Sequence, residues 1–344
     1  MEIDKKIIAL ISSIIILIFF AAISQAFFSP AGNQAEAVIF TVDKGEAVKE
    51  IASNLKDQKI IKNPYAFLIY TGLTGKYSKI QAGEYLLSSK MSVADIVRVL
   101  SRGETAKENV TIIEGWDLRD INSYLTNKGM TANEGLYSLS GTPAKEEDNA
   151  NVKELAQRFD FLADKSEKMS LEGYLFPDTY YLDKGDGAEA LIEKALQNFG
   201  EKMTPEMRNE IKKQKKTIFD IVTMASMIEK EVKTLKDKKI VSGILWKRMD
   251  SGMRLQVDAT ILYEENKEGL KIYTKDTQID SPYNTYRVDG LPLGPISNPG
   301  MDSIIAAIYP TTTPYYYYLS APDGKTIFSK TLEEHNYNKA KYLK

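Results

Sequence analysis

Two glutamates near the end of one helical pattern have the residue type and spacing that point most directly to chemistry. The pattern runs from Thr217 to Glu231, TIFDIVTMASMIEKE, and Thr217 with Asp220 makes a capping-box-like start. Apolar residues then recur at helical spacing and fill an arc of roughly 120° on a helical wheel. Glu229 falls inside this apolar arc, whereas Glu231 falls outside it, on the side expected to face water.

A carboxyl group on the apolar stripe of a core helix is suited to donating a proton. Burial disfavours the charged form of a carboxyl, so we expect Glu229 to be neutral and able to act as an acid near neutral pH. The alternative is that Glu229 pairs with a basic residue at the edge of the core. The helical wheel by itself favours neither interpretation.

The composition limits which other groups could do chemistry. Among 344 residues, 45 Lys and Arg face 47 Asp and Glu, so the charge balance does not indicate nucleic acid as a partner. The chain has no cysteine, which excludes disulfides, thiolate metal sites and a cysteine nucleophile. Its single histidine, His335, excludes a multi-histidine metal site, and we expect neither a metal nor another cofactor. Carboxylates and hydroxyls are therefore the available catalytic groups.

An apolar segment near the N-terminus predicts a membrane anchor. Residues 7–28 form 22 residues without a charge, which is long enough to span a bilayer. Lys5 and Lys6 precede it and predict that residues 1–6 are cytoplasmic and the remainder exported across the cytoplasmic (inner) membrane. A cleaved signal peptide is the alternative, but the apolar run exceeds a typical signal core, which favours a retained single-pass anchor. Residues 29–37 read as a short polar linker.

Residues 38–105 predict a small α/β module in the order strand, helix, helix, strand, helix. In the last helix, Ser92 and Asp95 make a plausible capping box and Gly103 a stop. The module contains no cluster of catalytic residue types. We therefore expect it to bind or to act as a spacer.

Residues 106–344 predict a mixed α+β domain that surrounds the glutamate helix. Leu171–Tyr181, LEGYLFPDTYY, suits either a groove that stacks on sugar rings or a packed aromatic strand. Residues 253–263, MRLQVDATILY, alternate between apolar and polar side chains and predict a strand. Its polar face would be either simply solvated or a platform for hydrogen bonds to a substrate, and it carries Arg254, Gln256, Asp258 and Thr260.

Two further segments complete this expected domain. Ser281–Gly300 is a long loop rich in Gly and Pro, and loops of that length in compact domains tend to carry function. Residues 314–329 predict a hairpin that turns at Pro322–Gly324. The expected fold class is α+β, with an N-terminal transmembrane helix, a small α/β module and a larger mixed domain.

Several motifs, in the same order over nearly the whole exported part, resemble the YceG-like (MltG-type) family of membrane-anchored endolytic murein transglycosylases. The proline loop departs at one position, with Leu293 where the family usually has a second Pro, which puts the geometry of one turn in question. The matching segments are Gln81–Tyr85, Glu114–Gly115, Glu172–Thr179, Ala225–Glu231, Gly252–Thr260, Ser281–Tyr286, Gly290–Ile296 and Asn298–Gly300, with His335–Asn336 as a late match of structural character.

The resemblance implies both a fold and a reaction. It implies a LysM-like fold for residues 38–105, which would bind glycan chains, and a catalytic domain for residues 106–344. The implied reaction cleaves the bond between N-acetylmuramic acid (MurNAc) and N-acetylglucosamine (GlcNAc) in peptidoglycan without water and leaves a 1,6-anhydroMurNAc end. It would terminate the elongation of nascent glycan strands, and it implies penicillin-binding proteins and other wall-synthesis proteins as partners.

The family's catalytic residue, the first Glu of the EKE triplet, corresponds to Glu229. Neutral Glu229 would protonate the glycosidic oxygen and then accept the proton of the sugar's 6-hydroxyl. The candidates for binding the glycan are Gln256, Asp258, Thr260, Tyr283, Asn284 and Tyr286.

Two other functions stay open at this point. One is a glycoside hydrolase in which Asp258 or Glu172 pairs with Glu229, which would release a reducing end. The other is a non-catalytic wall-binding protein, for which Glu229→Gln would leave function intact.

Overall fold

The computed structural model describes residues 5–32, 36–131, 135–267 and 272–343, with side chains from residue 10 onward. Residues 1–4 of the expected cytoplasmic segment and 33–35 of the expected linker lie outside this description. The chain divides into two compact units. The first contains the chain up to Glu108 together with Tyr181–Asp186, and the second contains Asn109–Tyr180 and Gly187–Lys344.

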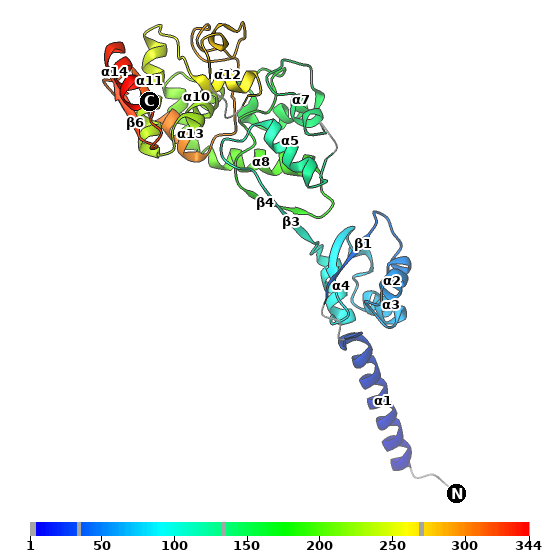
Figure 1. Cartoon of the computed structure of the whole chain (residues 1–344). Coiled ribbons are helices and arrows are strands. Elements are labelled where there is room, and N and C mark those ends of the chain that lie inside the picture. Colours follow the sequence, from blue (N-terminus) through cyan, green and yellow to red (C-terminus); the bar gives the residue numbers. More distant parts are fainter. Residues whose placement is uncertain (1–4, 33–35, 132–134, 268–271, 344) are drawn as a thin grey trace. The chain divides into compact units, whose positions relative to one another are not determined.

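Helices and small sheets make up both units, which confirms the predicted mixed α+β class (Figure 1). The described sheets are two-stranded and pair β1 with β2, β3 with β4, and β5 with β6. The first unit contains α1 (Lys5–Phe28), β1 (Val38–Val42), α2 (Val48–Asp57), α3 (Pro64–Leu73), η1 (Tyr77–Lys79), β2 (Gly83–Leu87) and α4 (Val93–Arg102).

The order of elements in the first unit is the predicted strand, helix, helix, strand, helix. β1 and β2 are antiparallel, with Phe40 opposite Tyr85, and both side chains are completely buried against the helices. The predicted start of α4 is confirmed, because Ser92 Oγ accepts a hydrogen bond of 3.1 Å from Asp95 N–H. Its predicted end is confirmed by Gly103, whose φ of 64° lies in the left-handed region.

α1 ends in contact with the rest of the first unit. Its stretch Leu10–Phe28 is long and apolar enough to cross a membrane, as the sequence predicts. Near its C-terminal end, Phe27 is buried and its ring lies 5.1 Å from the ring of Tyr70 on α3.

The second unit is mostly helical. β3 (Lys107–Thr111) and β4 (Thr179–Asp183) pair where the chain crosses between the two units. The remaining elements are α5 (Leu118–Asn127), α6 (Gly135–Ser140), α7 (Ala150–Arg158), η2 (Asp160–Leu162), α8 (Ala188–Lys202), α9 (Pro205–Lys213), α10 (Ile218–Glu231), α11 (Leu235–Asp250), α12 (Asp258–Glu264), η3 (Asp276–Gln278), α13 (Met301–Ile308), β5 (Tyr317–Ser320), β6 (Thr326–Ser329) and α14 (Leu332–Tyr342).

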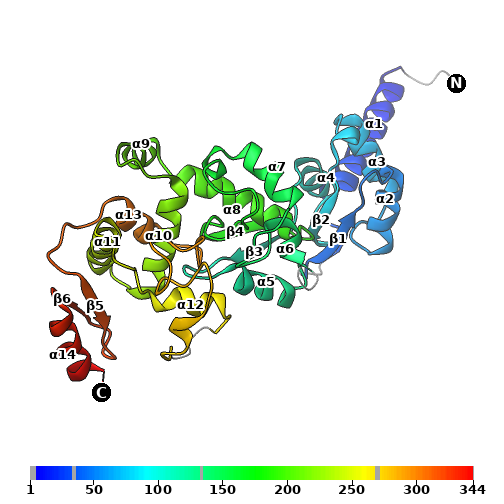
Figure 2. The same cartoon turned by 90° about the horizontal axis from the view of Figure 1, so that it is seen from above.

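α10, the predicted glutamate helix, lies at the centre of the second unit. The capping box is confirmed, since Thr217 Oγ1 accepts from Asp220 N–H at 3.0 Å and Asp220 Oδ2 accepts from Thr217 N–H at 2.8 Å. α9, α11, α12 and α13 all contact it, and Figure 2 shows α11, α12 and α13 around it. Thr223, Ser226 and Met227 are as buried as the apolar arc, so α10 has no broad face toward water before its last turn.

The predicted strand over residues 253–263 is wrong. Residues 253–257 are irregular, Gln256 has a left-handed φ of 53°, and α12 begins at Asp258. The alternation arose because Leu255 and Val257 are buried in an extended segment and Ile261, four residues later, is buried on a helix. The polar residues 254, 256, 258 and 260 therefore do not share one face.

Two other predicted segments have clear outcomes. The hairpin is confirmed as β5 and β6, with Ser320 opposite Thr326 and the turn between them. In Leu171–Tyr181 the packed alternative describes the structure, because Tyr174 and Phe176 are buried and the Tyr174 ring lies 5.2 Å from that of Phe199. That segment contributes to the core rather than to an open aromatic groove.

Candidate active site

Three consecutive residues at the end of α10 point to three different places. Successive side chains on a helix are about 100° apart, so neighbours in sequence diverge. Glu229 contacts the start of α13. Lys230 lines a cavity of about 290 Å³, and Glu231 lines a separate cleft of about 500 Å³.

Glu229 is held by three donors from two neighbouring helices. Lys238 Nζ on α11 lies 2.9 Å from Oε1, while Gly300 N–H and Ser303 Oγ donate to Oε2 at 2.9 Å and 2.7 Å. The N-terminus of α13, with its partial positive charge, also faces the carboxylate. An ammonium, a backbone N–H and a hydroxyl thus occupy both carboxyl oxygens of Glu229. The alternative stated from the sequence, pairing with a basic residue, describes the contacts of Glu229.

Glu231 has the opposite surroundings. It is half-buried, and burial, with the nearby charge of Asp258 as a smaller cause, raises its pKa to about 7. A hydrogen bond with Tyr318 acts in the other direction. This carboxyl retains a proton near neutral pH and borders an open cleft, which are the two properties that a general acid needs.

Polar side chains from separate segments gather around Glu231. Tyr286 donates its hydroxyl hydrogen bond to Asp258 Oδ1, and Arg248 Nη2 donates to Gln256 Oε1 at 2.6 Å. The cleft thus brings together Gln256, Asp258 and Tyr286, three of the six predicted glycan-binding residues. Its complete lining is Glu231, Arg248, Gln256, Asp258, Tyr286, Tyr317, Tyr318, Leu319, Ser320, Leu332, His335, Asn336, Lys339 and Leu343.

The other three predicted residues do not line this cleft. Thr260 Oγ1 donates to Val257 O at 2.8 Å, and Asn284 Nδ2 donates to Ile279 O at 2.6 Å. Asn284 Oδ1 also accepts from the backbone N–H of Tyr286 at 3.0 Å. Tyr283 is 1% exposed. Thr260 and Asn284 therefore form their hydrogen bonds inside the fold, where Asn284 also fixes the backbone of Tyr286, while Tyr283 is buried.

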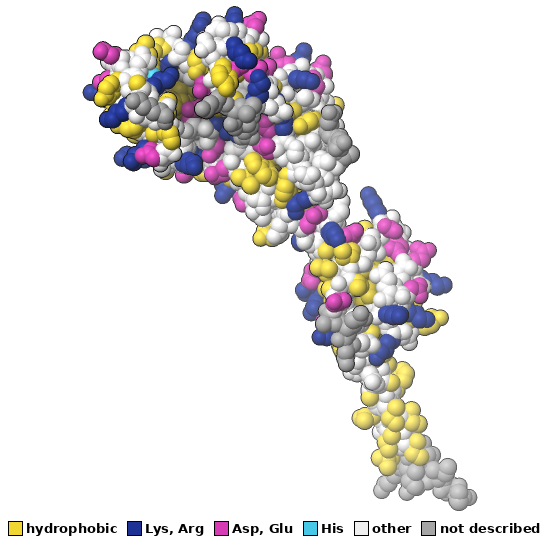
Figure 3. All heavy atoms as spheres, in the orientation of Figure 1, with side chains coloured by type: hydrophobic (Ala, Val, Ile, Leu, Met, Phe, Trp, Pro, Cys, Tyr) yellow, Lys and Arg dark blue, Asp and Glu magenta, His cyan; other side chains and the backbone are white. Residues whose placement is uncertain are grey.

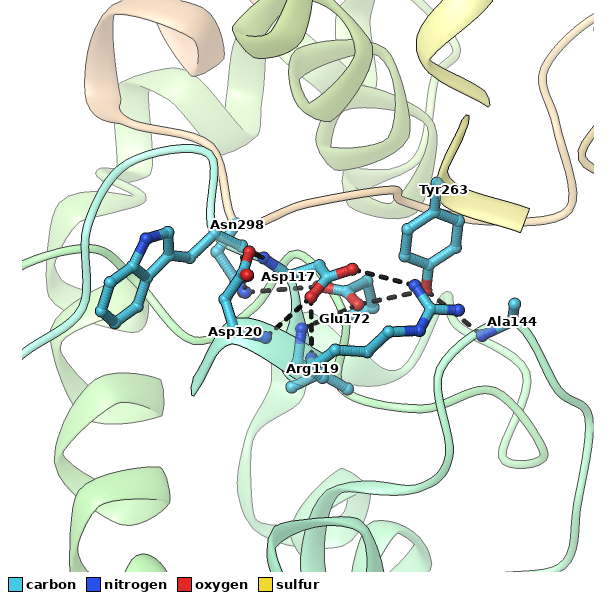
Figure 4. Close-up of polar contacts among 9 residues, drawn as sticks. Asp117, Arg119, Asp120, Ala144, Glu172, Tyr263 and Asn298 are labelled. Atoms are coloured by element: carbon cyan, nitrogen blue, oxygen red, sulfur yellow. Dashed lines mark hydrogen bonds and ion pairs between the residues drawn. The ribbon is translucent and has the colours of Figure 1, made fainter. Parts of the chain in front are cut away.

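Glu172 forms a second buried carboxyl centre in the same unit (Figure 4). It is 2% exposed, and its Oε2 accepts hydrogen bonds of 3.1 Å from Leu118 N–H and from the Tyr263 hydroxyl. Asn298 Nδ2 donates to Oε1 at 3.3 Å. Burial, and next the charge of Asp117, hold the pKa of Glu172 well above its usual range. Its partners come from α5, α12 and the loop before α13, so Glu172 joins these segments.

Asp117 and Arg119 extend this network toward the cavity beside Lys230. Asp117 Oδ1 accepts from Arg119 N–H at 2.7 Å, and its Oδ2 lies 2.9 Å from Arg119 Nη1. The guanidinium also lies 4.6 Å from the centre of the Tyr263 ring, as Figure 4 shows. These contacts fix the start of α5 and explain why Arg119 is held against an aromatic side chain.

Asn298 connects Glu172 to the Glu229 pocket. Its Oδ1 accepts from Leu175 N–H at 2.9 Å and its Nδ2 also donates to Trp116 O at 3.0 Å. Two residues later, Gly300 N–H reaches Glu229. The motif Asn298–Gly300 thus contacts both buried carboxyls, Glu172 through Asn298 and Glu229 through Gly300.

Sequence reasoning missed several residues of this site. Glu231 was assigned to water because a helical wheel shows only its own helix, whereas in the structure this side chain is half-buried beside Asp258 and Tyr318. Lys238 was hidden among the other lysines of its helix, and Tyr318 comes from the C-terminal hairpin; Asn336, named from the sequence only as a structural match, also lines the cleft. The detectable signals were the second glutamate of the triplet and the run of four tyrosines at 315–318.

Comparison with known proteins identifies the family of this chain. A model of the YceG-like family matches residues 40–341, and the chain belongs to this family. An endolytic murein transglycosylase of Bacillus subtilis (strain 168) is 35% identical over 326 residues, covering 93% of this chain and 89% of the relative. One from Streptococcus pneumoniae serotype 2 (strain D39 / NCTC 7466) is 29% identical over 331 residues, covering 90% of this chain and 59% of that protein.

A solved structure has a related fold. The crystal structure of a YceG-like protein from Listeria monocytogenes aligns with a TM-score of 0.60 and 33% identity. The alignment covers 89% of this chain and 100% of that chain.

Proposed function

We propose that this protein is an endolytic murein transglycosylase. It acts as a lyase on the MurNAc–GlcNAc bond of peptidoglycan and leaves a 1,6-anhydroMurNAc end. The relatives' names and the family support this reaction. The observation that carries it in this chain is that Glu231, whose pKa burial raises to about 7, lies at the edge of a cleft of about 500 Å³.

The reaction needs one group that first gives and then takes a proton. Protonated Glu231 donates its proton to the glycosidic oxygen as the bond to the anomeric carbon breaks. The resulting carboxylate takes the proton from the 6-hydroxyl of the same MurNAc, and that oxygen bonds to the anomeric carbon. No water is consumed, and Glu231 ends protonated as it began.

The neighbours of Glu231 fit the charge that develops during this step. Positive charge builds up on the anomeric carbon, and the carboxylate of Asp258 can stabilise it from the same cleft. Tyr286 donates to Asp258 and Arg248 donates to Gln256, so both side chains are oriented before a glycan binds. These contacts support Gln256, Asp258 and Tyr286 as glycan-binding residues.

Glu229 stays the alternative proton donor. As the acid it would have to leave an ion pair of 2.9 Å with Lys238 and two further hydrogen bonds. The surroundings support a different role, in which Glu229 joins α10, α11 and α13 and thereby positions Glu231 two residues later.

The second candidate function is a two-carboxylate glycoside hydrolase. The observation that favours it is that Glu231 and Asp258 share the cleft and that the charge of Asp258 contributes to the raised pKa of Glu231. A second carboxylate in reach of the sugar could activate water or form a glycosyl-enzyme. The product distinguishes the two reactions.

The test is to digest purified, uncrosslinked peptidoglycan strands with the full chain in detergent and to identify the new ends by mass spectrometry. Anhydro ends, one water lighter than reducing ends, are expected from the wild type. Reducing ends would replace the proposal by the hydrolase. Intact strands that nevertheless bind the protein would replace it by a wall-binding function.

The first unit supports a proposal for where in the cell the reaction takes place. We propose that α1 anchors the protein in the cytoplasmic membrane with its N-terminus inside the cell, supported by the apolar stretch Leu10–Phe28 and by Lys5 and Lys6 before it. The order of elements in the first unit supports a LysM-like module that holds the glycan strand. We further propose that the protein cuts nascent glycan strands beside penicillin-binding proteins and other wall-synthesis proteins. Such cuts would end the elongation of the strands.

A further inference from the structure

An apolar stripe on the first unit is left uncovered. Tyr65, Ile69 and Leu73 lie four residues apart on α3, so they share one face of the helix, and Tyr77 follows in η1. Their exposed fractions are 70%, 54%, 75% and 52%. The opposite face of α3 buries Ala66 and Phe67 in the core, so this helix is apolar on both sides. Such a stripe on a protein surface marks a place of contact.

The segment of sequence that carries the stripe has charges of one sign. Between Gln58 and Gly83 the sequence contains four lysines and no acidic residue. The lysines lie at both ends of the stripe, at positions 59, 62, 76 and 79. A short apolar helix with aromatic residues and flanking lysines is the composition of a segment that lies on an anionic lipid surface.

The helix that carries the stripe also contacts the end of the apolar helix α1. The ring of Tyr70 on α3 lies 5.1 Å from the ring of Phe27 and 6.1 Å from that of Phe28. Phe28 is the last residue of the apolar stretch, so this is the level at which the chain leaves the hydrocarbon core. Figure 1 shows α3 beside this end of α1, and Figure 3 shows dark blue Lys and Arg side chains on the adjoining surface.

We propose that α3 is an interfacial helix that lies on the outer surface of the membrane crossed by α1. Tyr65, Ile69, Leu73 and Tyr77 enter the boundary between headgroups and acyl chains, and the four lysines face the phosphates of anionic lipids. This inference rests on the proposed membrane anchor. It fixes the first unit against the bilayer, so that the unit does not swing freely on the linker.

The absence of cysteine allows a direct test in the full chain. Single cysteines are introduced as Leu73→Cys in the stripe, Leu17→Cys in α1 and Lys49→Cys on the exposed surface of α2. Each is labelled with the fluorophore NBD, and the protein is reconstituted into vesicles of phosphatidylcholine and phosphatidylglycerol. Lipids with a spin label near the headgroup or deep in the chain then quench fluorophores at their own depth.

We expect strong quenching at position 73 by the shallow label, at position 17 by the deep label, and at position 49 by neither. Adding Ile69→Glu to the Leu73→Cys protein should reduce the shallow quenching severalfold and leave position 17 unchanged. Phosphatidylcholine vesicles without the anionic lipid should also reduce it.

Quenching at 17 but not at 73 would overturn the interfacial helix while the anchor stands. Quenching at neither position would overturn the anchor and this inference with it. Equal quenching at 73 and 49 would mean unspecific adsorption of the unit and would also overturn the proposal.

Discussion

Lys238 donates a hydrogen bond of 2.9 Å to Oε1 of Glu229, and both side chains are almost completely withdrawn from water, with 4% and 9% of their surfaces exposed. The pair joins α11 to the end of α10, and Gly300 and Ser303 add the start of α13. A buried ion pair of this kind contributes little when complete, but the loss of one partner leaves a charge in a place that water cannot reach. We therefore expect the pair to fix the positions of α10, α11 and α13 relative to one another.

Replacing the ammonium alone should be costly. Lys238→Met leaves the Glu229 carboxylate buried with only neutral donors, and we expect the second unit to lose about 3–5 kcal/mol of its free energy of unfolding. Denaturant unfolding measures this. Lys236→Met, at an exposed position of the same helix, is the matched control and should change stability by less than about 0.5 kcal/mol. Equal effects of the two variants would mean that the ion pair is not structural.

The raised pKa of Glu231 predicts the pH dependence of cleavage. Burial favours the protonated form, and with a pKa of about 7 this form is populated below neutral pH and lost above it. The rate should be level in the acidic range and fall about tenfold per pH unit above pH 7. The same shift stabilises the folded state below the unfolded-state value of 4.5, and this contribution is lost as pH rises through about 7. A rate that rises from pH 6 to 9 would contradict Glu231 as the acid.

Two neighbours should move this profile in opposite directions. The charge of Asp258 raises the pKa of Glu231, so Asp258→Asn should shift the falling limb to lower pH. The hydrogen bond from Tyr318 lowers that pKa, so Tyr318→Phe should shift the limb to higher pH. The pH profile of the remaining activity measures both, whatever the loss of rate. Tyr316→Phe, outside the cleft lining, serves as the control and should leave the midpoint in place.

The helical wheel located a helix that borders the cleft, but it did not show the surroundings of Glu231. The capping box at Thr217 and Asp220 and the apolar spacing depend on neighbours within four residues, which the sequence shows directly. The surroundings of Glu231 depend on Asp258 and Tyr318, which come from distant parts of the chain. A pattern that assumes one wet face cannot describe a helix that four others cover.

The wrong strand at residues 253–263 has a similar cause. Positions 255 and 257 are buried at the spacing of two that an extended chain has, and positions 257 and 261 at the spacing of four that a helix has. An alternating sequence is compatible with both spacings. What decides between them is the turn at Gln256, whose left-handed φ of 53° is stabilised by Gln256 N–H donating to Thr285 O at 3.0 Å. That contact spans two segments far apart in sequence, so only the fold reveals it. The sequence nevertheless selected residues of this segment that line the cleft, namely Gln256 and Asp258.

Asn298 should be needed for both stability and activity. It is completely buried, and Asn298→Ala leaves Leu175 N–H without its acceptor and Glu172 Oε1 without the amide donor. Each buried group left unpaired costs about 1–3 kcal/mol, and the displaced Gly300 would loosen Glu229. The free energy of unfolding, measured with denaturant, and the cleavage rate should both decrease. Asn127→Ala, exposed at the end of α5, is the control and should change neither.

Replacing each of the two glutamates of α10 by glutamine should have different effects on the cleavage rate and on the free energy of unfolding. Glu231→Gln removes the proton donor but keeps the shape of the cleft, so cleavage should fall about 10²–10⁴-fold while the free energy of unfolding stays the same or rises at pH 8. Glu229→Gln breaks the ion pair and leaves the Lys238 ammonium buried, so it should lower stability by about 3–5 kcal/mol.

Restoring the charge balance distinguishes a positioning role of Glu229 from a catalytic one. Adding Lys238→Met to Glu229→Gln removes the unpaired ammonium and should recover most of the stability. If Glu229 only positions Glu231, activity should recover with it. A stable double variant without activity, beside a Glu231→Gln protein that still cuts glycan strands, would make Glu229 the acid, and Glu231 would then be a cleft residue with a raised pKa and no part in proton transfer.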